Sequence, residues 1–292
     1  MRLLKYFFGL FIISLFLVVS SCTKSEEEII PNNVAPPDST ISNLAIEGYI
    51  NKVYISVLGR EPDSSEYAGA WNVLNPANAS PSSRTIFLDN VFIKPEYNNR
   101  IYDLARADYL NNVDTLDIIG QIALYQSLLL DSSYYLLWDI IEYEKERAEK
   151  LQEIPADLLS GLIDIKEVQK RCSDNYVFDD LNMGSLNFVV AVFQNIIRRY
   201  PTMSELNASI EMVDGTTSIL FFEVGSSKDD FLDIFFDSSD YYEGQVRDLY
   251  LRYLLREPNT VEMSAASIKY KNSDDYKQLQ KDILILDEYM GI

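Results

Sequence analysis

Apolar residues recur at the period of an α-helix in three separate stretches of the chain. Each stretch places five apolar residues at positions i, i+3, i+4, i+7 and i+8. These residues are Ile50, Val53, Tyr54, Val57 and Leu58 in the first stretch, Val189, Val192, Phe193, Ile196 and Ile197 in the second, and Val246, Leu249, Tyr250, Tyr253 and Leu254 in the third. This spacing follows one face of a helix, so the pattern predicts three α-helices that each bury one face.

The same polar motif follows each apolar stripe. An aromatic residue is followed by Arg six positions later, Pro at eight and Glu at twelve. The members are Tyr54, Arg60, Pro62 and Glu66 in the first copy, Phe193, Arg199, Pro201 and Glu205 in the second, and Tyr250, Arg256, Pro258 and Glu262 in the third. Because proline disfavours helical backbone in the residue before it, each proline predicts the end of the preceding helix.

A second helix is predicted to begin directly after each proline. Asp63, Thr202 and Asn259 are favourable N-cap residues, and each has a Glu three positions later. This combination is a capping box, in which the cap side chain and the Glu accept hydrogen bonds from free backbone N–H groups. Each motif therefore predicts a helix, a sharp corner and another helix. The Arg and Glu could also form a catalytic or ligand-binding pair, but their recurrence at three places favours a structural role at the corner.

Another shared block follows each corner and closes on an acidic residue and a tyrosine. The blocks are Phe87–Tyr97, Phe231–Tyr241 and Leu279–Tyr289. Units of this kind cannot bury their apolar faces alone and must stack on neighbours. We therefore expect an all-α fold, in which three divergent helix-corner-helix repeats stack with a helical insert in one elongated or compact helical domain. The expected boundaries are 45–110 for repeat 1, 111–185 for the insert, 186–244 for repeat 2 and 245–292 for repeat 3.

These residues also carry a family resemblance. Leu58-Gly-Arg-Glu-Pro-Asp63, together with the later block ending in Glu96 and Tyr97, resembles the helical domain of unknown function that is related to phycobilisome linker polypeptides. That domain occurs in many bacterial surface and secreted proteins. The later copies depart from its pattern, because Arg198 and Leu255 replace the glycine. The resemblance implies an all-α interaction module and provides no catalytic residues to transfer.

The insert reads as further helices. Leu116–Leu130 and Tyr134–Leu151 are expected helices, with Asp114 and Asp131 as caps, and the charged end of the second helix is expected to project into solvent. Ile154–Cys172 is expected to be a third helix. Residues 171–184 are polar and turn-like, and the acidic stretch 174–182 could hold calcium. Because it lacks the spacing of an EF-hand, no metal is predicted, and the question of calcium stays open. Outside the insert, residues 217–224 are the one ambiguous, strand-like run.

The N-terminus reads as a targeting segment. Residues 1–21 combine a basic start, Arg2 and Lys5, with an apolar core too short to span a membrane. Val18-Val-Ser-Ser-Cys22 resembles the lipobox of bacterial lipoproteins, which implies cleavage before Cys22 and lipidation of its thiol. The alternative is an ordinary secretory signal with a chance cysteine.

The residues after Cys22 indicate where an anchored protein would go. Lys24, Glu26, Glu27 and Glu28 resemble the signal that exports lipoproteins of Bacteroidetes-type bacteria to the outer face of the outer membrane. The alternative is a solvated charge run within a tether. Residues 22–44 as a whole have the acidic, proline-containing composition of a tether. We therefore expect a lipid-anchored protein of the outer membrane that faces the cell exterior.

Charge and composition narrow the possible functions. The net charge of the chain is −20, and removing residues 1–21 leaves 23 basic against 45 acidic residues. This excess disfavours nucleic acid and anionic membranes as partners and suits a basic partner. The chain contains no histidine, and lipidation of Cys22 would leave only Cys172. The common general base, the Ser and Cys triads and the usual zinc ligand are therefore missing, and no cofactor is expected.

The sequence favours a non-catalytic cell-surface lipoprotein. We expect a protein-interaction or scaffold module in an envelope, secretion or adhesion assembly, with a protein partner and with membrane contact only through the lipid on Cys22. The alternative is a glycan-binding lipoprotein that uses exposed aromatics, since the chain has 20 Tyr together with Trp71 and Trp138. A hydrolase that uses two carboxylates is a third possibility, although no acidic pair stands out.

Overall fold

The structure is a computed structural model, and it describes residues 40–292. The predicted signal peptide, the lipidation site Cys22 and the export signal Lys24, Glu26, Glu27 and Glu28 lie outside the described residues. Residues 41–292 form one unit with a shared hydrophobic core. Within residues 40–292, no helix combines the length and the apolar character needed to cross a membrane.

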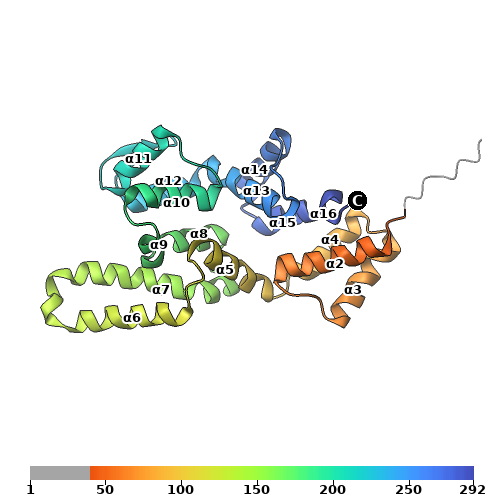
Figure 1. The fold of residues 1–292 in the computed structure, drawn as a ribbon, viewed down its shortest axis with the longest axis horizontal. Helices are drawn as coiled ribbons and strands as arrows, with labels where there is room; N and C mark the ends of the chain where they lie inside the picture. The colour runs from red at the N-terminus through yellow and green to blue at the C-terminus, as the bar shows by residue number, and fades with distance from the viewer. Residues whose placement is uncertain (1–39) are drawn as a thin grey trace, which may run out of the picture. The chain divides into compact units, whose positions relative to one another are not determined.

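The described chain is almost entirely helical, which confirms the all-α prediction (Figure 1). The first part contains α2 (Asn43–Leu58), α3 (Ser64–Leu74), η1 (Asn75–Ala77), α4 (Pro81–Phe92) and α5 (Glu96–Tyr109). The insert contains α6 (Thr115–Leu130), η2 (Ser132–Leu137), α7 (Trp138–Ser160), α8 (Ile165–Ser173) and α9 (Tyr176–Leu181). The last part contains α10 (Ser185–Ile197), α11 (Met203–Val213), β1 (Ser218–Leu220), β2 (Glu223–Gly225), α12 (Lys228–Asp237), α13 (Ser239–Leu254), α14 (Thr260–Ser273), α15 (Tyr276–Leu284) and α16 (Asp287–Met290).

The three predicted apolar stripes form the buried faces of α2, α10 and α13. All of their members are buried except Leu254, which is half-buried. The second shared block covers the end of α4, α12 or α15 and the start of the helix that follows, and it buries the same five positions in each copy. These positions are Phe87, Leu88, Val91, Phe92 and Tyr97; Phe231, Leu232, Phe235, Phe236 and Tyr241; and Leu279, Gln280, Ile283, Leu284 and Tyr289. The period of the sequence therefore corresponds directly to the core.

Helix α13 belongs to two copies of the motif at once. It begins beside the acidic-tyrosine pair of the second copy and ends at the corner of the third. The expected boundary between residues 244 and 245 lies inside this continuous helix. Gly244 packs against α10 so closely that an added Cβ would lie 2.5 Å from Cα of Ile197. Glycine at this position thus permits the close approach of the two helices.

The C-terminal residues pack against α2 and α4. The hydroxyl of Tyr49 donates to the carbonyl of Leu284 at 3.1 Å, and Lys52 Nζ donates to the carbonyl of Tyr289 at 2.9 Å. Arg84 of α4 is only 2% exposed and donates to the carbonyl of Ile285 at 2.6 Å. Segments from opposite ends of the described chain are therefore joined by buried polar contacts.

In the insert, α6 and α7 form an antiparallel pair joined by η2 (Figure 1). Asp114 caps α6, as predicted. The expected helix start at Tyr134 is wrong, because Asp131 caps η2 and α7 begins only at Trp138, without a side-chain cap. The expected helix end at Leu151 is wrong, because α7 continues through Pro155 to Ser160. Burial of Leu151 and Ile154 against the core offsets the backbone hydrogen bond that proline removes. The expected helix Ile154–Cys172 is consequently divided between the end of α7 and α8.

Two further expectations about irregular segments need correction. The polar stretch 171–184 is not one turn, because it contains the end of α8 and the short helix α9. The ambiguous run 217–224 forms two short antiparallel strands, β1 and β2. Phe221 and Phe222 connect these strands with positive φ angles of 51° and 72°, and the side chain of Phe222 is exposed.

Candidate functional site

The predicted Arg and Glu of each motif lie together at the corner. Arg60 binds both oxygens of Glu66 at 2.7 and 2.8 Å, and the two later pairs, Arg199–Glu205 and Arg256–Glu262, have distances between 2.7 and 2.8 Å. The same Glu accepts the backbone N–H of the N-cap residue in all three copies, which confirms the predicted capping boxes.

A third charged residue completes each corner, and the sequence did not reveal its role. Arg60 also binds Glu96 at 2.8 Å, and Arg256 binds Glu288 at 2.7 Å. Arg199 makes the equivalent ion pair with Asp240. These are the acidic residues of the recurring acidic-tyrosine pairs. Their recurrence at the same place in every block was the signal that could have identified them.

The aromatic residue of the motif lies beneath its Arg. The guanidinium carbon lies 5.8 Å from the ring centre of Tyr54 in the first copy, 5.1 Å from that of Phe193 in the second and 5.2 Å from that of Tyr250 in the third. Cations are attracted to aromatic faces at this range. Each Arg also donates to the carbonyl of the residue that follows it, at 3.0 to 3.1 Å. Each of these Arg side chains thus has two carboxylates, an aromatic ring and a backbone carbonyl as structural partners.

The backbone turns at each corner through one left-handed residue. Gly59, Arg198 and Leu255 have φ angles of 76°, 56° and 57°. Glycine adopts this conformation without strain, whereas other L-residues do so at a cost. The first corner is therefore relaxed and the other two are strained. The later copies thus depart from the glycine pattern at the very residue whose backbone is left-handed.

The corner carboxylates are held in their ionised form. Hydrogen bonds from Arg60 keep the pKa of Glu66 well below its usual range, and those from Arg256 lower the pKa of Glu262 to about 2. Burial tends to raise the pKa of Glu205, but the bonds from Arg199 and the cap outweigh it, and this pKa is lowered as well. A carboxylate with these partners is a poor proton acceptor at neutral pH, so the corners have the chemistry of structural joints.

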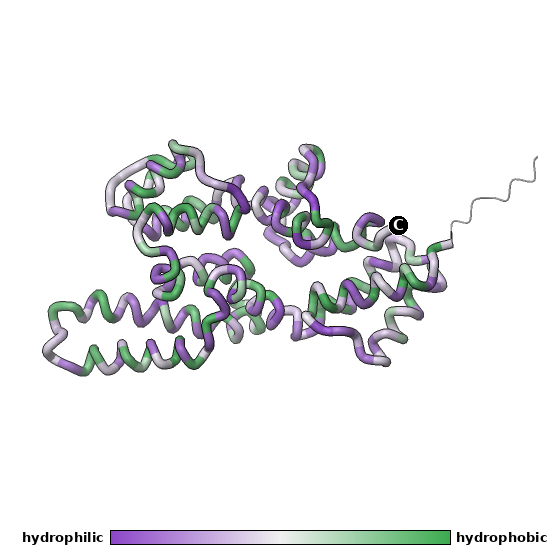
Figure 2. The backbone as a smooth tube through the Cα atoms, in the orientation of Figure 1, coloured by the Kyte–Doolittle hydropathy of each residue, from purple (hydrophilic) through white to green (hydrophobic). Residues whose placement is uncertain are grey.

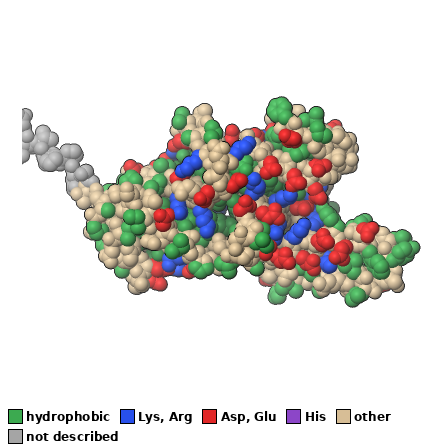
Figure 3. Space-filling view, turned by 180° about the vertical axis from the view of Figure 1, so that it is seen from behind, with side chains coloured by type: hydrophobic (Ala, Val, Ile, Leu, Met, Phe, Trp, Pro, Cys, Tyr) green, Lys and Arg blue, Asp and Glu red, His purple; other side chains and the backbone are tan. Residues whose placement is uncertain are grey.

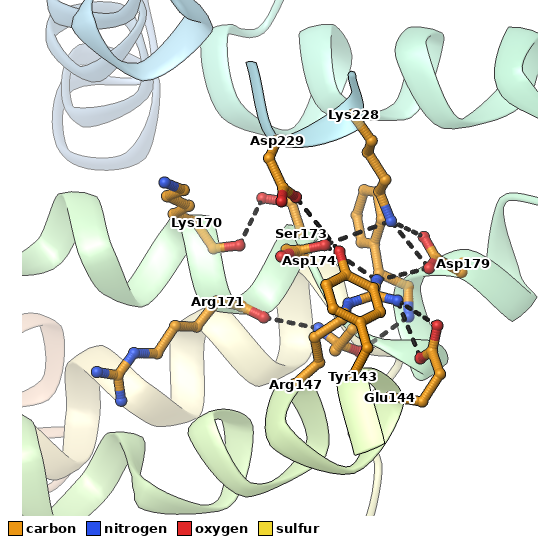
Figure 4. A network of polar contacts seen from close by, with 12 residues as sticks. Tyr143, Glu144, Arg147, Lys170, Arg171, Ser173, Asp174, Asp179, Lys228 and Asp229 are labelled. Atoms are coloured by element: carbon orange, nitrogen blue, oxygen red, sulfur yellow. Dashed lines mark hydrogen bonds and ion pairs between the residues drawn. The ribbon is translucent and has the colours of Figure 1, made fainter. Parts of the chain in front are cut away.

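A buried cation joins the insert to the rest of the unit (Figure 4). Arg147 of α7 is 5% exposed and contacts Glu144 at 2.8 Å, Asp179 at 2.6 Å and Asp174 at 3.0 Å. Lys228 of α12 binds Asp179 from the other side at 2.7 Å. Arg147 and Leu151 therefore pack against neighbouring elements, although Glu146 and Lys150 on the other face of α7 are exposed. The expectation that this end of the helix projects into solvent is wrong.

This cluster also bears on the acidic stretch 174–182. Asp174 and Asp179 contact the cations of Arg147 and Lys228, and Asn175 is buried and caps α9 with its side chain. Between residues 40 and 292, no group of three or more Asp, Glu, His or Cys side chains is arranged to hold a metal ion. Asp174 and Asp179 thus neutralise the buried Arg147 of α7 and the half-buried Lys228 of α12.

The opposite half of the α6–α7 hairpin is the unusual surface. Every residue from 131 to 140 is exposed. Residues 130–138 contain six exposed large apolar side chains, which are called the apical patch below; they are Leu130, Tyr134, Tyr135, Leu136, Leu137 and Trp138. Leu130 is 88% and Leu136 is 79% exposed. Figure 2 shows hydrophobic residues alternating with hydrophilic ones along both helices, and Figure 3 shows hydrophobic side chains at the hairpin end, at the lower right.

A charged cleft of about 220 Å³ lies between α7, α8 and α12. Three of its carboxylates have cationic partners, since Glu167 binds Arg171 at 2.8 Å, Asp233 binds Lys170 and Asp174 binds Arg147. A two-carboxylate hydrolase needs one carboxyl of raised pKa as its general acid. Among the carboxyl groups of residues 40–292, every pKa that is shifted is lowered. This geometry offers the hydrolase hypothesis no support.

The remaining candidate groups are a thiol and the tryptophans. Cys172 is fully buried, and burial raises the pKa of its thiol to about 12, which makes it unreactive at neutral pH. Trp71 is half-buried and stacks on Tyr67, with ring centres 6.1 Å apart. Trp138 is 39% exposed. The two tryptophans therefore lie in different settings and form no common sugar-binding platform.

Comparison of the chain with protein-family models, with curated proteins and with solved structures finds no match. The resemblance to linker-related helical domains, carried by Leu58–Asp63 and its later copies, therefore remains a prediction. The functional argument depends on the chain's own geometry.

Proposed function

We propose that this chain is a non-catalytic interaction module, held at the outer membrane by a lipid on Cys22 and facing the cell exterior. The observation that carries the interaction role is the apical patch. Monomeric soluble proteins rarely expose large contiguous apolar surfaces, and those that do commonly use them to bind a partner. The patch extends from a rigid base, because the Arg147 cluster and the buried end of α7 hold the hairpin to the core.

The corners support the same proposal because their charged residues are already bound to one another. Their Arg, Glu and acidic-tyrosine residues bind one another and hold helices together. None of the three copies offers a carboxylate suited to proton transfer at neutral pH. The recurring motif therefore acts as a scaffold. Surfaces outside the corners, such as the apical patch, remain available to bind a partner.

Photo-crosslinking in the producing cells tests the interaction role. A photoreactive amino acid is placed at Tyr135, in the patch, and in a second strain at Tyr67, which lies on α3. We expect a reproducible crosslinked species from the first position at native expression level. Recovery of the monomer alone from both positions, with the protein correctly folded, would contradict the proposal.

Two variants test the location. Cys22→Ala should prevent lipidation and release the protein from the membrane fraction, and unchanged fractionation would refute the anchor. Replacing Glu26, Glu27 and Glu28 by Ala should retain the anchor but protect the protein from protease added to intact cells. Continued cleavage in that variant would refute the export signal alone.

Glycan binding is the second candidate, and the exposure of Tyr134, Tyr135 and Trp138 favours it. Sugar rings stack on aromatic faces that lie side by side. Between residues 40 and 292, however, no ring contact joins two of these three side chains, whereas Tyr67 and Trp71 stack on each other. Retention of the protein on polysaccharide columns, lost on Trp138→Ala, would raise this candidate above protein binding.

A further inference from the structure

The apical patch has the size of a protein interface. From the exposed fractions of its six residues, its accessible area, backbone included, is roughly 700 Å². Stable protein interfaces bury about 800 Å² on each partner. The patch also contains two kinds of residue that dominate binding energy, because Tyr and Trp are enriched at interface hot spots. Its area and composition therefore suit a specific contact.

The charges around the patch are of one sign. No Lys or Arg occurs between Arg106 and Lys145, a stretch that includes α6, η2 and the start of α7. Asp131 directly follows Leu130, and Asp139 directly follows Trp138. Both aspartates are exposed, and within residues 40–292 neither has an ion-pair partner, whereas Glu144 at the base of the hairpin binds Arg147. The apolar patch thus has an acidic border.

The acidic border favours one of three possible binding partners for the patch, which are a second copy of the chain, a lipid surface and another protein. A second copy of the chain would bring Asp131 and Asp139 against the same residues of its partner, and like charges in an interface are strongly unfavourable. A lipid surface would have to accommodate Asp131, whose pKa is lowered by hydrogen bonds from Ser133, so that it stays charged at neutral pH. A protein surface with its own cations meets neither difficulty.

We infer that the apical patch docks onto a partner protein whose apolar surface is bordered by Lys or Arg. This inference rests on the proposed function and names the surface and the partner chemistry for it. The large apolar side chains supply the contact area. Asp131 and Asp139 select the partner by charge and accelerate the encounter at low salt.

A synthetic probe tests the chemistry of recognition directly. The full chain carrying Cys22→Ala, handled without detergent, is titrated into a labelled amphipathic helix built from Leu and Lys. A helix of Leu and Glu with the same pattern serves as the control probe. We expect binding of the Leu/Lys helix only. Leu130→Ser with Leu136→Ser should weaken that binding at least tenfold.

Charge exchange gives the sharper outcome. The variant Asp131→Lys with Asp139→Lys should bind the Leu/Lys helix with at least tenfold lower affinity, and it should gain affinity for the Leu/Glu helix. Glu153→Lys, an exposed change farther along α7, is the matched charge control and should alter neither affinity. Equal loss in Glu153→Lys would show that total charge governs binding, and would overturn the inference.

Apolar controls address general stickiness. Leu159 and Leu162 are also exposed and lie at the far end of α7 and just beyond it. Serine at both positions should leave binding of the Leu/Lys helix unchanged. If it lowers the affinity as much as the patch variant does, any exposed leucine suffices and the inference fails.

The other occupants are separate outcomes. A dimer in sedimentation that Leu130→Ser with Leu136→Ser dissociates would identify a second copy, and flotation with phosphatidylcholine vesicles that the same variant abolishes would identify a lipid surface. Either result overturns the inference. Crosslinking from cells separates it from the proposed function: a partner still captured by the patch variant leaves the function standing and removes this site, whereas no partner from any position removes both.

Discussion

At each corner one Arg binds two carboxylates and lies over an aromatic ring, whereas the apical patch presents six large apolar side chains to solvent. The corner recurs three times with the same distances, and the patch occurs on an insert that has no copy elsewhere in the described chain. Charged residues that pair with one another inside the fold stabilise it. Apolar residues that the fold leaves exposed are available to bind a partner. The recurring motif therefore accounts for the architecture, and the unique insert accounts for the binding.

The largest expected effect comes from Gly244, at the close approach of α10 and α13. Gly244→Ala places a Cβ 2.5 Å from the backbone of Ile197, so it should destabilise the protein by about 3 kcal/mol, the upper range for overpacking. Gly120→Ala in α6 is the control. An added Cβ there meets no atom within 4 Å, and alanine should stabilise that helix by about 0.5–1 kcal/mol. Urea unfolding measures both, and equal effects would refute the packing argument.

Removing a corner Arg should have the next largest effect. Arg199→Ala leaves Glu205 and Asp240 without their shared cation, so it should lower the free energy of unfolding by about 1.5 kcal/mol. This value is the lower range for charged hydrogen bonds, because the site is partly exposed.

Thr202→Ala at the same corner should lower the free energy of unfolding by about 0.5–2 kcal/mol through loss of the cap. The double variant Arg199→Ala, Glu205→Ala should be less destabilised than the sum of its single variants, because the residues share one network. Strict additivity in thermal melts would contradict the network.

Acid should weaken the corners in a defined pH window. The pKa of Glu262 is lowered from 4.5 to about 2 in the folded chain. A lowered carboxyl pKa stabilises the fold fully above the unfolded value, and this contribution is lost as the pH falls from 4.5 toward 2. Glu262→Gln should therefore be less stable than the native chain at pH 7, and the difference should shrink toward pH 2. Urea unfolding across this range gives the result, and a constant difference would refute the assignment.

A smaller effect should come from the left-handed corner residues. Leu255 has a φ angle of 57° and an exposed side chain, so Leu255→Gly should stabilise the chain by about 1 kcal/mol through relief of strain. Gly59→Ala at the first corner makes the reverse change and should destabilise it. Melting temperatures that move in the same direction for both variants would contradict the strain argument.

The smallest effect on stability is expected in the apical patch. Leu130→Ser with Leu136→Ser removes side chains that contact little of the core, so unfolding should change by no more than about 0.5 kcal/mol. A clear loss of stability, measured by urea unfolding, would show that these leucines belong to the fold.

Local periodicity and capping chemistry made the corners predictable. The stripes on α2, α10 and α13 and the capping boxes at Asp63, Thr202 and Asn259 follow from nearby residues, and the structure confirms them. The ion pairs with Glu96, Asp240 and Glu288 were harder to predict. Each acidic residue lies 32 to 41 positions after the Arg that it binds, on a later helix that packs back against the corner.

The insert was less predictable, because long-range packing overrides its local signals. The charged run late in α7 indicated a helix end in solvent, yet Asp174 and Asp179 from other elements neutralise Arg147 and bury its side chain, and Lys228 binds Asp179 from the other side. With Arg147 and Leu151 packed against neighbouring elements, the apolar start of α7 lies at the exposed tip. The sequence contained every residue of the candidate site, but its exposure depends on contacts distant in the chain.

The most direct test compares two sets of variants in two assays. One set replaces Glu66, Glu205 and Glu262 by Ala, singly and together, and the other replaces Leu130 and Leu136 by Ser. Thermal melting and capture of the crosslinked partner are measured for each. The corner variants should lower the melting temperature by similar, nearly additive steps and should still capture the partner below that temperature. The patch variant should melt like the native chain and lose the partner. Loss of capture from a single corner Glu, without a change in melting and with capture intact in the patch variant, would contradict the account.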